Sequence, residues 1–219
     1  MAVALVTGGS RGLGKAVVRE FEGRGWVVLC PSRNELDLAK AESIKSYCDG
    51  VASVGPLGAL VHSAGVNWPR PLGQTCEEEW QATLQVNITA FRQLLQGLAS
   101  QLVGGRVVAM GSILGLVSRT NRSAYSASKA GLLGLIRALS IELASQHTLI
   151  NAVCPGYIDT DMTRQNNSEK QLAEIASGIP LGRLGTPEEV AKITYWLCSV
   201  ENTYVTGQGF VIDGGFTCL

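Results

Sequence analysis

Charged residues are scarce in this chain of 219 residues: Lys, Arg, Asp and Glu together make up 16%, and 18 cations balance 18 anions. A protein that binds nucleic acid needs a basic surface to neutralise phosphates, so the net charge of zero argues against that class. Hydrophobic residues reach 46%. A chain of this length with so few charges must bury much of its surface, which favours a sheet covered by helices on both faces.

Residues of the kinds that bind metals are also few. The chain has two histidines and six cysteines, and no two cysteines stand at CxxC spacing. These counts argue against a zinc site and against a disulfide framework, so we expect no metal and reduced cysteines in a cytoplasmic protein. No apolar run has transmembrane length and no leader pattern follows Met1, so we expect no membrane association.

Glycine is abundant, and its first cluster follows a short apolar strand at 3–6. Thr7 to Gly14 reads TGGSRGLG, and helical periodicity follows from Lys15 to Arg24. A glycine turn between a strand and a helix is the context that a dinucleotide-binding turn requires. The free N–H groups and the positive dipole end of the helix would bind phosphates. The spacing is GxxxGxG rather than GxGxxG, and an ordinary turn is the alternative.

The end of the second expected strand, 26–30, bears on which dinucleotide binds. An acid at this place binds the ribose 2′-hydroxyl, whereas an arginine favours a 2′-phosphate. Residues 30–34 contain no acid, and Arg11 and Arg33 can both reach this corner. The pattern predicts NADP(H) rather than NAD(H), and two solvated arginines are the alternative.

The next segment is unusually short. The chain passes from Arg33 to Asp37 within four residues and then into a helical stretch at 39–47 and a strand at 59–62. A complete helix and strand do not fit between Arg33 and Asp37. We therefore expect that the usual crossover is missing and that the sheet is narrower, or frayed, at this edge.

The rest of the chain alternates strands and helices. Expected strands at 107–111, 149–153 and 209–212 are interleaved with helices at 80–97, 125–145 and 187–199. This alternation indicates a parallel, doubly wound sheet in one domain. The polar segment 161–180, after a strand's carboxyl end, contains a weakly amphipathic helix around 168–177 and is expected to form a lid. The helix at 187–199 should begin with Thr186 as its cap and Pro187 at its first position.

Two positions in these elements stand out. Asn87 lies inside the helix at 80–97, where asparagine competes for backbone bonds, so either a kink or a held water is expected, with an exposed asparagine as the alternative. His62 is expected to be a packed strand residue rather than a ligand. The small residues at 63–65 would let a flat ring lie beside them.

Tyr125 and Lys129 are spaced four apart and therefore share one face of a helix. An ammonium near a phenol favours the phenolate, so we expect Tyr125 to exchange a proton near neutral pH. Ser112 ends the strand at 107–111, where open parallel sheets place their sites. The YxxxK spacing alone is weak evidence, because most such pairs are solvated helix faces.

Taken together, these motifs resemble the short-chain dehydrogenase/reductase family over essentially the whole chain. The glycine turn matches the family's TGxxxGxG, and Ser112, Tyr125 and Lys129 match its catalytic serine and YxxxK at the family's spacing. Asn87 stands at the place of the family's active-site asparagine. Residues 155–160 match its PGxxxT. Within the family, three segments are most similar in sequence to 3-oxoacyl-(acyl carrier protein) reductases; they are PGYIDTDMT, IPLGRLGTPEEVA and VTGQGFVIDGG.

The resemblance implies a single-domain Rossmann-type doubly wound parallel sheet over residues 1–219, shortened between strands two and four. The catalytic residues that it implies are Asn87, Ser112, Tyr125 and Lys129. It also implies that Asn87, Tyr125 and Lys129 contact the cofactor. The further residues that it implies for cofactor binding are Gly8, Ser10, Arg11, Gly12, Leu13, Gly14, Ser32, Arg33, Asp37, Leu38, Ala64, Gly65, Pro155, Gly156, Ile158 and Thr160.

The implied reaction is hydride transfer between NADP(H) and a small carbonyl or secondary alcohol substrate, with a ketoreductase of 3-oxoacyl-type substrates as the leading hypothesis. In this scheme Tyr125 is the general acid, Lys129 lowers its pKa and binds the nicotinamide ribose, and Ser112 holds the substrate oxygen. Asn87 would hold a water that links Lys129 to solvent. Thr160 and the backbone of Ile158 would fix the carboxamide.

Other functions stay open. One alternative is a sugar or polyol dehydrogenase, or a reductase of secondary metabolism, in which arginines near the site meet an anionic substrate; the candidates are Arg119, Arg122, Arg164 and Arg183. Another is a catalytically silent dinucleotide sensor. Val103 and Gln146 stand where carrier-protein reductases have basic residues, which leaves a carrier-bound and a free substrate as alternatives.

The resemblance also implies a homotetramer, or a homodimer, that pairs through the helices at 80–98 and 125–145 and through the C-terminal strand. Small residues on the second helix would allow close packing between subunits; they are Ala127, Ala130, Gly131, Gly134 and Ala138. The alternative is that these residues pack on the chain's own sheet.

Overall fold

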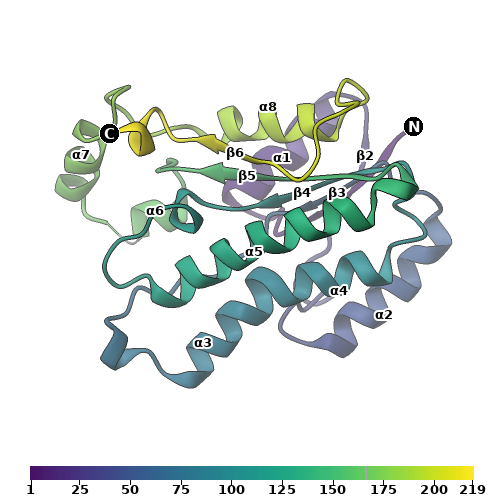
Figure 1. Ribbon diagram of the computed structural model, residues 1–219, viewed down its shortest axis with the longest axis horizontal. Coiled ribbons are helices and arrows are strands. Elements are labelled where there is room, and N and C mark those ends of the chain that lie inside the picture. The colour runs from purple at the N-terminus through teal and green to yellow at the C-terminus, as the bar shows by residue number, and fades with distance from the viewer. Residues whose placement is uncertain (166) are drawn as a thin grey trace.

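The computed structural model describes residues 1–165 and 167–219, and its centre is a six-stranded parallel sheet (Figure 1). The strand order is β2-β1-β3-β4-β5-β6. The strands are β1 (Val3–Thr7), β2 (Val27–Leu29), β3 (Ala59–His62), β4 (Arg106–Met110), β5 (Leu149–Pro155) and β6 (Gly209–Ile212).

Helices cover both faces of the sheet, as Figure 1 shows. One face carries α1 (Gly12–Gly23) and α8 (Pro187–Cys198), and the other carries α2 (Ala41–Val51), α4 (Ala90–Gly97) and α5 (Ser123–Glu142). Alternate residues of β1 therefore enter different cores: Leu5 packs in one hydrophobic cluster, and Ala4 and Val6 pack in the other. Such burial on both faces explains the apolar strands and confirms the expected doubly wound fold.

The shortened edge is as expected. Residues 31–40 form turns and no helix lies between Arg33 and Asp37. The edge strand β2 has only three residues, and within the described part of the chain no further strand pairs with it. It is shorter than the expected 26–30 because it pairs with β1 alone, from Val27 to Leu29.

The expected helix at 80–97 is interrupted. It consists of α3 (Glu77–Leu84), a π-helical turn (Gln85–Thr89) and α4. Asn87 lies in the π-helical turn and is fully buried. The alternative of an exposed asparagine is thus wrong, and π-helical turns of this kind occur frequently at functional sites.

The segment after β5 contains two helices, of which only the second was expected. α6 (Asp161–Gln165) is a single short helix, and α7 (Glu169–Ser177) begins with a capping box formed by Ser168 and Gln171. The expected start of α8 is confirmed, with Thr186 as N-cap and Pro187 in its first turn. In the part of the chain that the structure describes, no helix is both long and apolar enough to cross a bilayer.

Candidate active site

A cleft of about 190 Å³ opens at the carboxyl ends of β4 and β5. Ser112, Tyr125 and Lys129 all line it, so the structure brings together three of the four residues expected to be catalytic. Besides Tyr125 and Lys129, six of the expected cofactor-binding residues line the same cleft; these are Leu13, Gly65, Pro155, Gly156, Ile158 and Thr160. This is the sheet edge at which open α/β folds place their sites.

The glycine turn between β1 and α1 has the geometry of a phosphate cradle. Gly8 has a φ of 70°, and a Cβ there would lie 2.7 Å from the backbone of Ala64. A Cβ on Gly14 would overlap the carbonyl of Gly8. α1 begins at Gly12, and no side chain caps its first N–H groups. These free donors and the helix dipole fit the pyrophosphate of a dinucleotide.

Lys129 is the buried charge of the site, with 3% of its surface exposed. Its Nζ donates a 2.6 Å hydrogen bond to the carbonyl of Met110, at the end of β4. Burial lowers the pKa of the ammonium to about 8. Lys129 is therefore held at the edge of the sheet, 5.5 Å from the centre of the Tyr125 ring.

Tyr125 does not have the lowered pKa that its spacing from Lys129 suggested. Burial raises the pKa of the phenol, while a hydrogen-bonding interaction with Ser112 and the charge of Arg122 act in the opposite direction. The expectation of a favoured phenolate is wrong for this arrangement, because desolvation outweighs the nearby donors and the ammonium is engaged by Met110. Ser112 Oγ also accepts a 3.1 Å hydrogen bond from the Leu114 backbone.

Asn87 is fixed by three hydrogen bonds within the protein. Its Oδ1 accepts from Val66 N at 2.9 Å, and its Nδ2 donates to Val66 O and to Ser128 Oγ at 3.0 Å each. Both amide donors are therefore used, and they hold the loop after β3 against α5. That Asn87 holds a water linking Lys129 to solvent stays a prediction. The residue lies behind Gly65, where a Cβ would be 3.4 Å from Asn87 Oδ1 and 3.8 Å from Lys129 Nζ.

His62 is a structural residue of this region whose role sequence reasoning underestimated. Its Nδ1 lies 3.0 Å from Thr7 Oγ1, and its Nε2 lies 3.2 Å from the carbonyl of Val86 in the π-helical turn. Burial and the charge of Lys129 lower its pKa to about 3, so the ring is neutral. The prediction of a packed strand residue is confirmed. The histidine also connects the strand before the glycine turn to the π-helical turn. In the sequence, the only indication of this role was its position next to the small residues at 63–65.

The corner after β2 contains an acid that sequence reasoning missed. Glu35 Oε2 accepts a 2.8 Å hydrogen bond from Ser32 N, although no acid lies at 30–34. Arg33 is 85% exposed and lies 3.7 Å from Asp37 Oδ1. The sequence did contain a signal for this contact. Ser32 and Glu35 have the Ser-x-x-Glu spacing, in which the glutamate side chain accepts a hydrogen bond from the backbone N–H three residues earlier. Leu38 is buried beside this corner.

The remaining predicted residues lie around these two regions. Ser10 and Arg11 are exposed on the glycine turn, outside the cleft. Thr160 lines the cleft, and its hydroxyl lies 3.1 Å from that of Thr163. Among the described residues, no group of three or more His, Cys, Asp or Glu side chains is placed to hold a metal ion.

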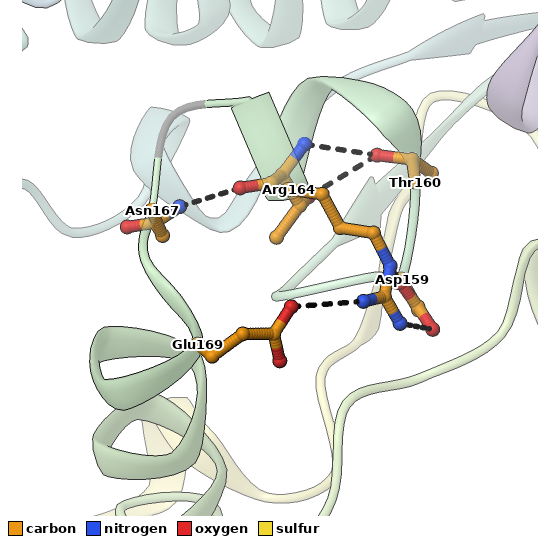
Figure 2. Close-up of polar contacts among 6 residues, drawn as sticks. Asp159, Thr160, Arg164, Asn167 and Glu169 are labelled. Carbon is orange, nitrogen blue, oxygen red and sulfur yellow. Dashed lines mark hydrogen bonds and ion pairs between the residues drawn. The ribbon is translucent and has the colours of Figure 1, made fainter.

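Ion pairs fix the start of the segment after β5, as Figure 2 shows. Arg164 binds both carboxylate oxygens of Asp159, at 2.7 and 2.8 Å, and lies 3.5 Å from Glu169. Asn167 donates to the carbonyl of Thr163 at 2.8 Å. Arg164 and Asn167 are therefore held by contacts with residues of the same segment.

The parallel sheet, the glycine turn and the cleft define a dinucleotide-binding α/β protein, and comparisons with known proteins identify its family. Residues 30–217 match the family model described as enoyl-(acyl carrier protein) reductase. The chain is 32% identical over 235 aligned positions to the 3-oxoacyl-(acyl-carrier-protein) reductase FabG of Vibrio cholerae, covering 97% of this chain and 96% of that one. It is 33% identical over 234 positions to the acetoacetyl-CoA reductase of Shinella zoogloeoides, covering 97% of each.

Solved structures agree. A short-chain dehydrogenase family protein from Francisella tularensis superimposes with a TM-score of 0.94 at 27% identity, covering all of both chains. A blue fluorescent protein from a metagenomic library, in complex with NADPH, superimposes with a TM-score of 0.88 at 29% identity, covering 98% of this chain and 97% of that one. The chain belongs to the short-chain dehydrogenase/reductase family, and it is an oxidoreductase with an NAD(P)-binding Rossmann-type fold.

Proposed function

We propose that this protein is an NADP(H)-dependent ketoreductase of small 3-oxoacyl-type substrates. The observation that carries the proposal is the convergence of Ser112, Tyr125 and Lys129 on one cleft beside the glycine turn. The relatives that reduce 3-oxoacyl thioesters by name support the substrate type. When bound, the cofactor supplies the hydride.

The chain's own groups would manage the proton and the substrate oxygen. Tyr125 donates the proton as the carbonyl is reduced, and Ser112 hydrogen-bonds the same oxygen and stabilises its developing charge. Lys129 places a positive charge beneath Tyr125 and binds the nicotinamide ribose. Ile158 and Thr160, at the mouth of the cleft, fix the carboxamide so that one face of the ring meets the substrate.

The preference for NADP(H) is supported by Arg11 and Arg33 at the adenosine corner and by the NADPH-bound neighbour. Asp37 and Leu38 would contact the adenine. Glu35 opposes the preference, because its carboxylate repels a 2′-phosphate. We therefore propose that NADPH is preferred over NADH by a modest factor.

A free substrate fits better than one attached to a carrier protein. Val103 is 59% exposed and uncharged, and the backbone of neighbouring Gly104 bonds the carbonyl of Gln146. Neither Val103 nor Gln146 provides the positive charge that an acidic carrier would need. Coenzyme A thioesters and small 3-oxo compounds are thus the substrates to test first.

We also propose that residues 1–219 form one dinucleotide-binding and catalytic domain in a cytoplasmic homotetramer or homodimer. All six cysteines are free thiols, as is typical of a reducing compartment. Ala127, Ala130 and Ala138 are exposed on α5 rather than packed on the chain's own sheet, which supports close contact with a second subunit. Light scattering tests the assembly, and a monomer would contradict it.

The function is tested by following NADPH oxidation with a panel of ketones, 3-oxoacyl thioesters and sugars. We expect turnover with 3-oxoacyl compounds, and Tyr125→Phe should abolish it while NADPH still binds. Turnover confined to sugars would favour a sugar dehydrogenase. NADPH binding without any turnover would favour a dinucleotide sensor. Activity that persists in Tyr125→Phe would refute the assignment of the general acid.

A further inference from the structure

Three side chains with positive charge line the cleft, and no acid lines it among the described residues. Besides Lys129 these are Arg119 and Arg122. The chain as a whole has no net charge, so this concentration of cations at one cleft is local. A cleft with cations and no acid attracts an anionic ligand, because its low-dielectric walls strengthen the field inside it.

The four arginines that the sequence places in loops around the site fall into two groups, according to whether an acid pairs with them. Arg164 and Arg183 are engaged by acids: Arg164 binds Asp159, and Arg183 forms a two-pronged pair with Glu189 at 2.7 and 2.9 Å. Arg119 and Arg122 have no ion pair with an acid in the described part of the chain, and each instead contacts a neutral group.

Those neutral contacts aim both guanidinium groups at the cleft. Arg119 donates a 2.7 Å hydrogen bond to Tyr157 Oη, and Arg122 donates a 3.3 Å bond to Asn67 Oδ1. Tyr157 and Asn67 line the cleft themselves. Burial and the charge of Arg119 both lower the pKa of Arg122, so the two cations are close enough to repel each other. Such a pair is stabilised by a bound oxyanion between or beside its members.

The position of the pair limits how far the anion lies from the reacting carbonyl. Arg122 is the N-cap residue of α5, and Tyr125 lies in the first turn of that helix. The two residues are thus within one helical turn, and the charge of Arg122 acts on the phenol of Tyr125. An anionic group bound by Arg122 would therefore lie in the same cleft as the carbonyl that meets Tyr125.

We propose that Arg119 and Arg122 form an oxyanion site that selects substrates carrying a carboxylate or a phosphate within a few bonds of the reacting carbonyl. The proposal rests on the reductase function proposed above and adds that the carbonyl substrate is a small oxo acid or an oxo phosphate. Arginine suits both groups, because its planar donors bind two oxygens at once.

The test compares matched pairs of charged and neutral substrates with NADPH. The pairs are 3-oxobutanoate with its methyl ester, and dihydroxyacetone phosphate with dihydroxyacetone. We expect the wild-type protein to have the lower KM for the anionic member of at least one pair, and the pair concerned distinguishes a carboxylate site from a phosphate site. Arg122→Gln and the double variant with Arg119→Gln should raise the KM for that anion about tenfold more than for its neutral partner.

Arg183→Gln is the matched control, because it removes an arginine near the site that is already paired with Glu189. It should leave the anion-to-neutral ratio of KM unchanged. The proposal would be overturned if the wild-type protein had the same KM for both members of each pair. It would also be overturned if the double variant had the same anion-to-neutral ratio of KM as the wild-type protein. Either result would leave the reductase function intact.

A binding measurement tests the oxyanion site independently of the reductase function. The shift in melting temperature caused by each anion is measured with NADP present, in the wild-type protein and in the double variant. A shift that the double variant loses supports the oxyanion site even if no substrate is reduced, in which case the reductase function fails. Anions that shift neither protein more than their neutral partners do would overturn the oxyanion site.

Discussion

The two ends of the region proposed to bind the cofactor are built differently. At the catalytic end, Asn87, Lys129 and His62 are buried and each is fixed by hydrogen bonds to backbone or to other buried groups. At the adenosine corner, Arg33 and Glu35 are exposed and held by one contact each. Buried polar groups are costly to leave unpaired, whereas exposed ion pairs contribute little. Substitutions should therefore have large effects at the first end and small effects at the second.

The largest effect should come from Lys129→Met. Turnover should fall on the order of a thousandfold, because Tyr125 loses the positive charge beside it. Stability should not fall, since removing a buried ammonium whose pKa is lowered to about 8 also removes the cost of burying it. Steady-state kinetics and thermal melting measure the two properties. Lys45→Met, which removes a lysine from an exposed ion pair, should change neither. A destabilised Lys129→Met protein would contradict the view that this lysine is held at a cost.

Asn87→Leu should lower the free energy of unfolding by about 3 kcal/mol. The variant leaves the N–H and the carbonyl of Val66 without their partners and removes a bond to Ser128. Urea denaturation measures the loss. The exposed Asn34 is the control, and Asn34→Leu should change the free energy by less than about 0.5 kcal/mol. Equal, small losses in both variants would break the contrast between the two regions.

His62 should make the protein's stability depend on pH. Its pKa is lowered from 6.5 to about 3 in the folded state, so only the unfolded chain takes up a proton between these values. Stability is therefore fully present above about pH 6.5 and falls as the pH is lowered from there towards 3, by up to about 1.4 kcal/mol per pH unit.

His62→Asn should remove this part of the pH dependence, which denaturation at pH 5, 6 and 7 would show. His147→Asn is a close control, because His147 is exposed and has a φ of 56°, a conformation that asparagine tolerates. It should leave the slope as it is in the wild-type protein. The same slope in the His62 and His147 variants would show that the buried ring is not its source.

The smallest effect should come from Glu35→Gln at the adenosine corner. Loss of the carboxylate beside Ser32 N should raise the preference for NADPH over NADH about two- to fivefold, and Arg33→Gln should lower it by a similar factor. The ratio of kcat/KM for the two cofactors measures both changes. Glu42→Gln, on the exposed side of α2, should leave the ratio unchanged. A change of a hundredfold in any of these variants would mean that the corner is as tightly constrained as the catalytic end.

The sequence predicted the elements well where the pattern is local. Periodicity placed the central strands, and Thr186 with Pro187 marked the start of α8 to the residue. The four-residue passage from Arg33 to Asp37 predicted the missing crossover. The weak points were α6, which has only five residues, and the exact length of β2, which depends on pairing with β1.

The candidate site was predicted as a list of residues rather than as an environment. Burial reverses the expected direction of the pKa of Tyr125, and Asn87 uses its amide donors on Val66 and Ser128. Neither result can be read from spacing, because desolvation and hydrogen-bond partners come from distant segments. The arginines show the same limit, since four of them look equivalent in the sequence.

The sequence by itself determined the parallel α/β fold, the turn at residues 8–14 and the Tyr125–Lys129 pair, because strand, turn and helix patterns depend on neighbours along the chain. The tertiary structure decided which charges remain unpaired at the cleft. Arg164 and Arg183 meet acids, whereas Arg119 and Arg122 donate hydrogen bonds to the neutral groups of Tyr157 and Asn67. A charge becomes available to a ligand through what lies around it in space, and folding alone sets those surroundings.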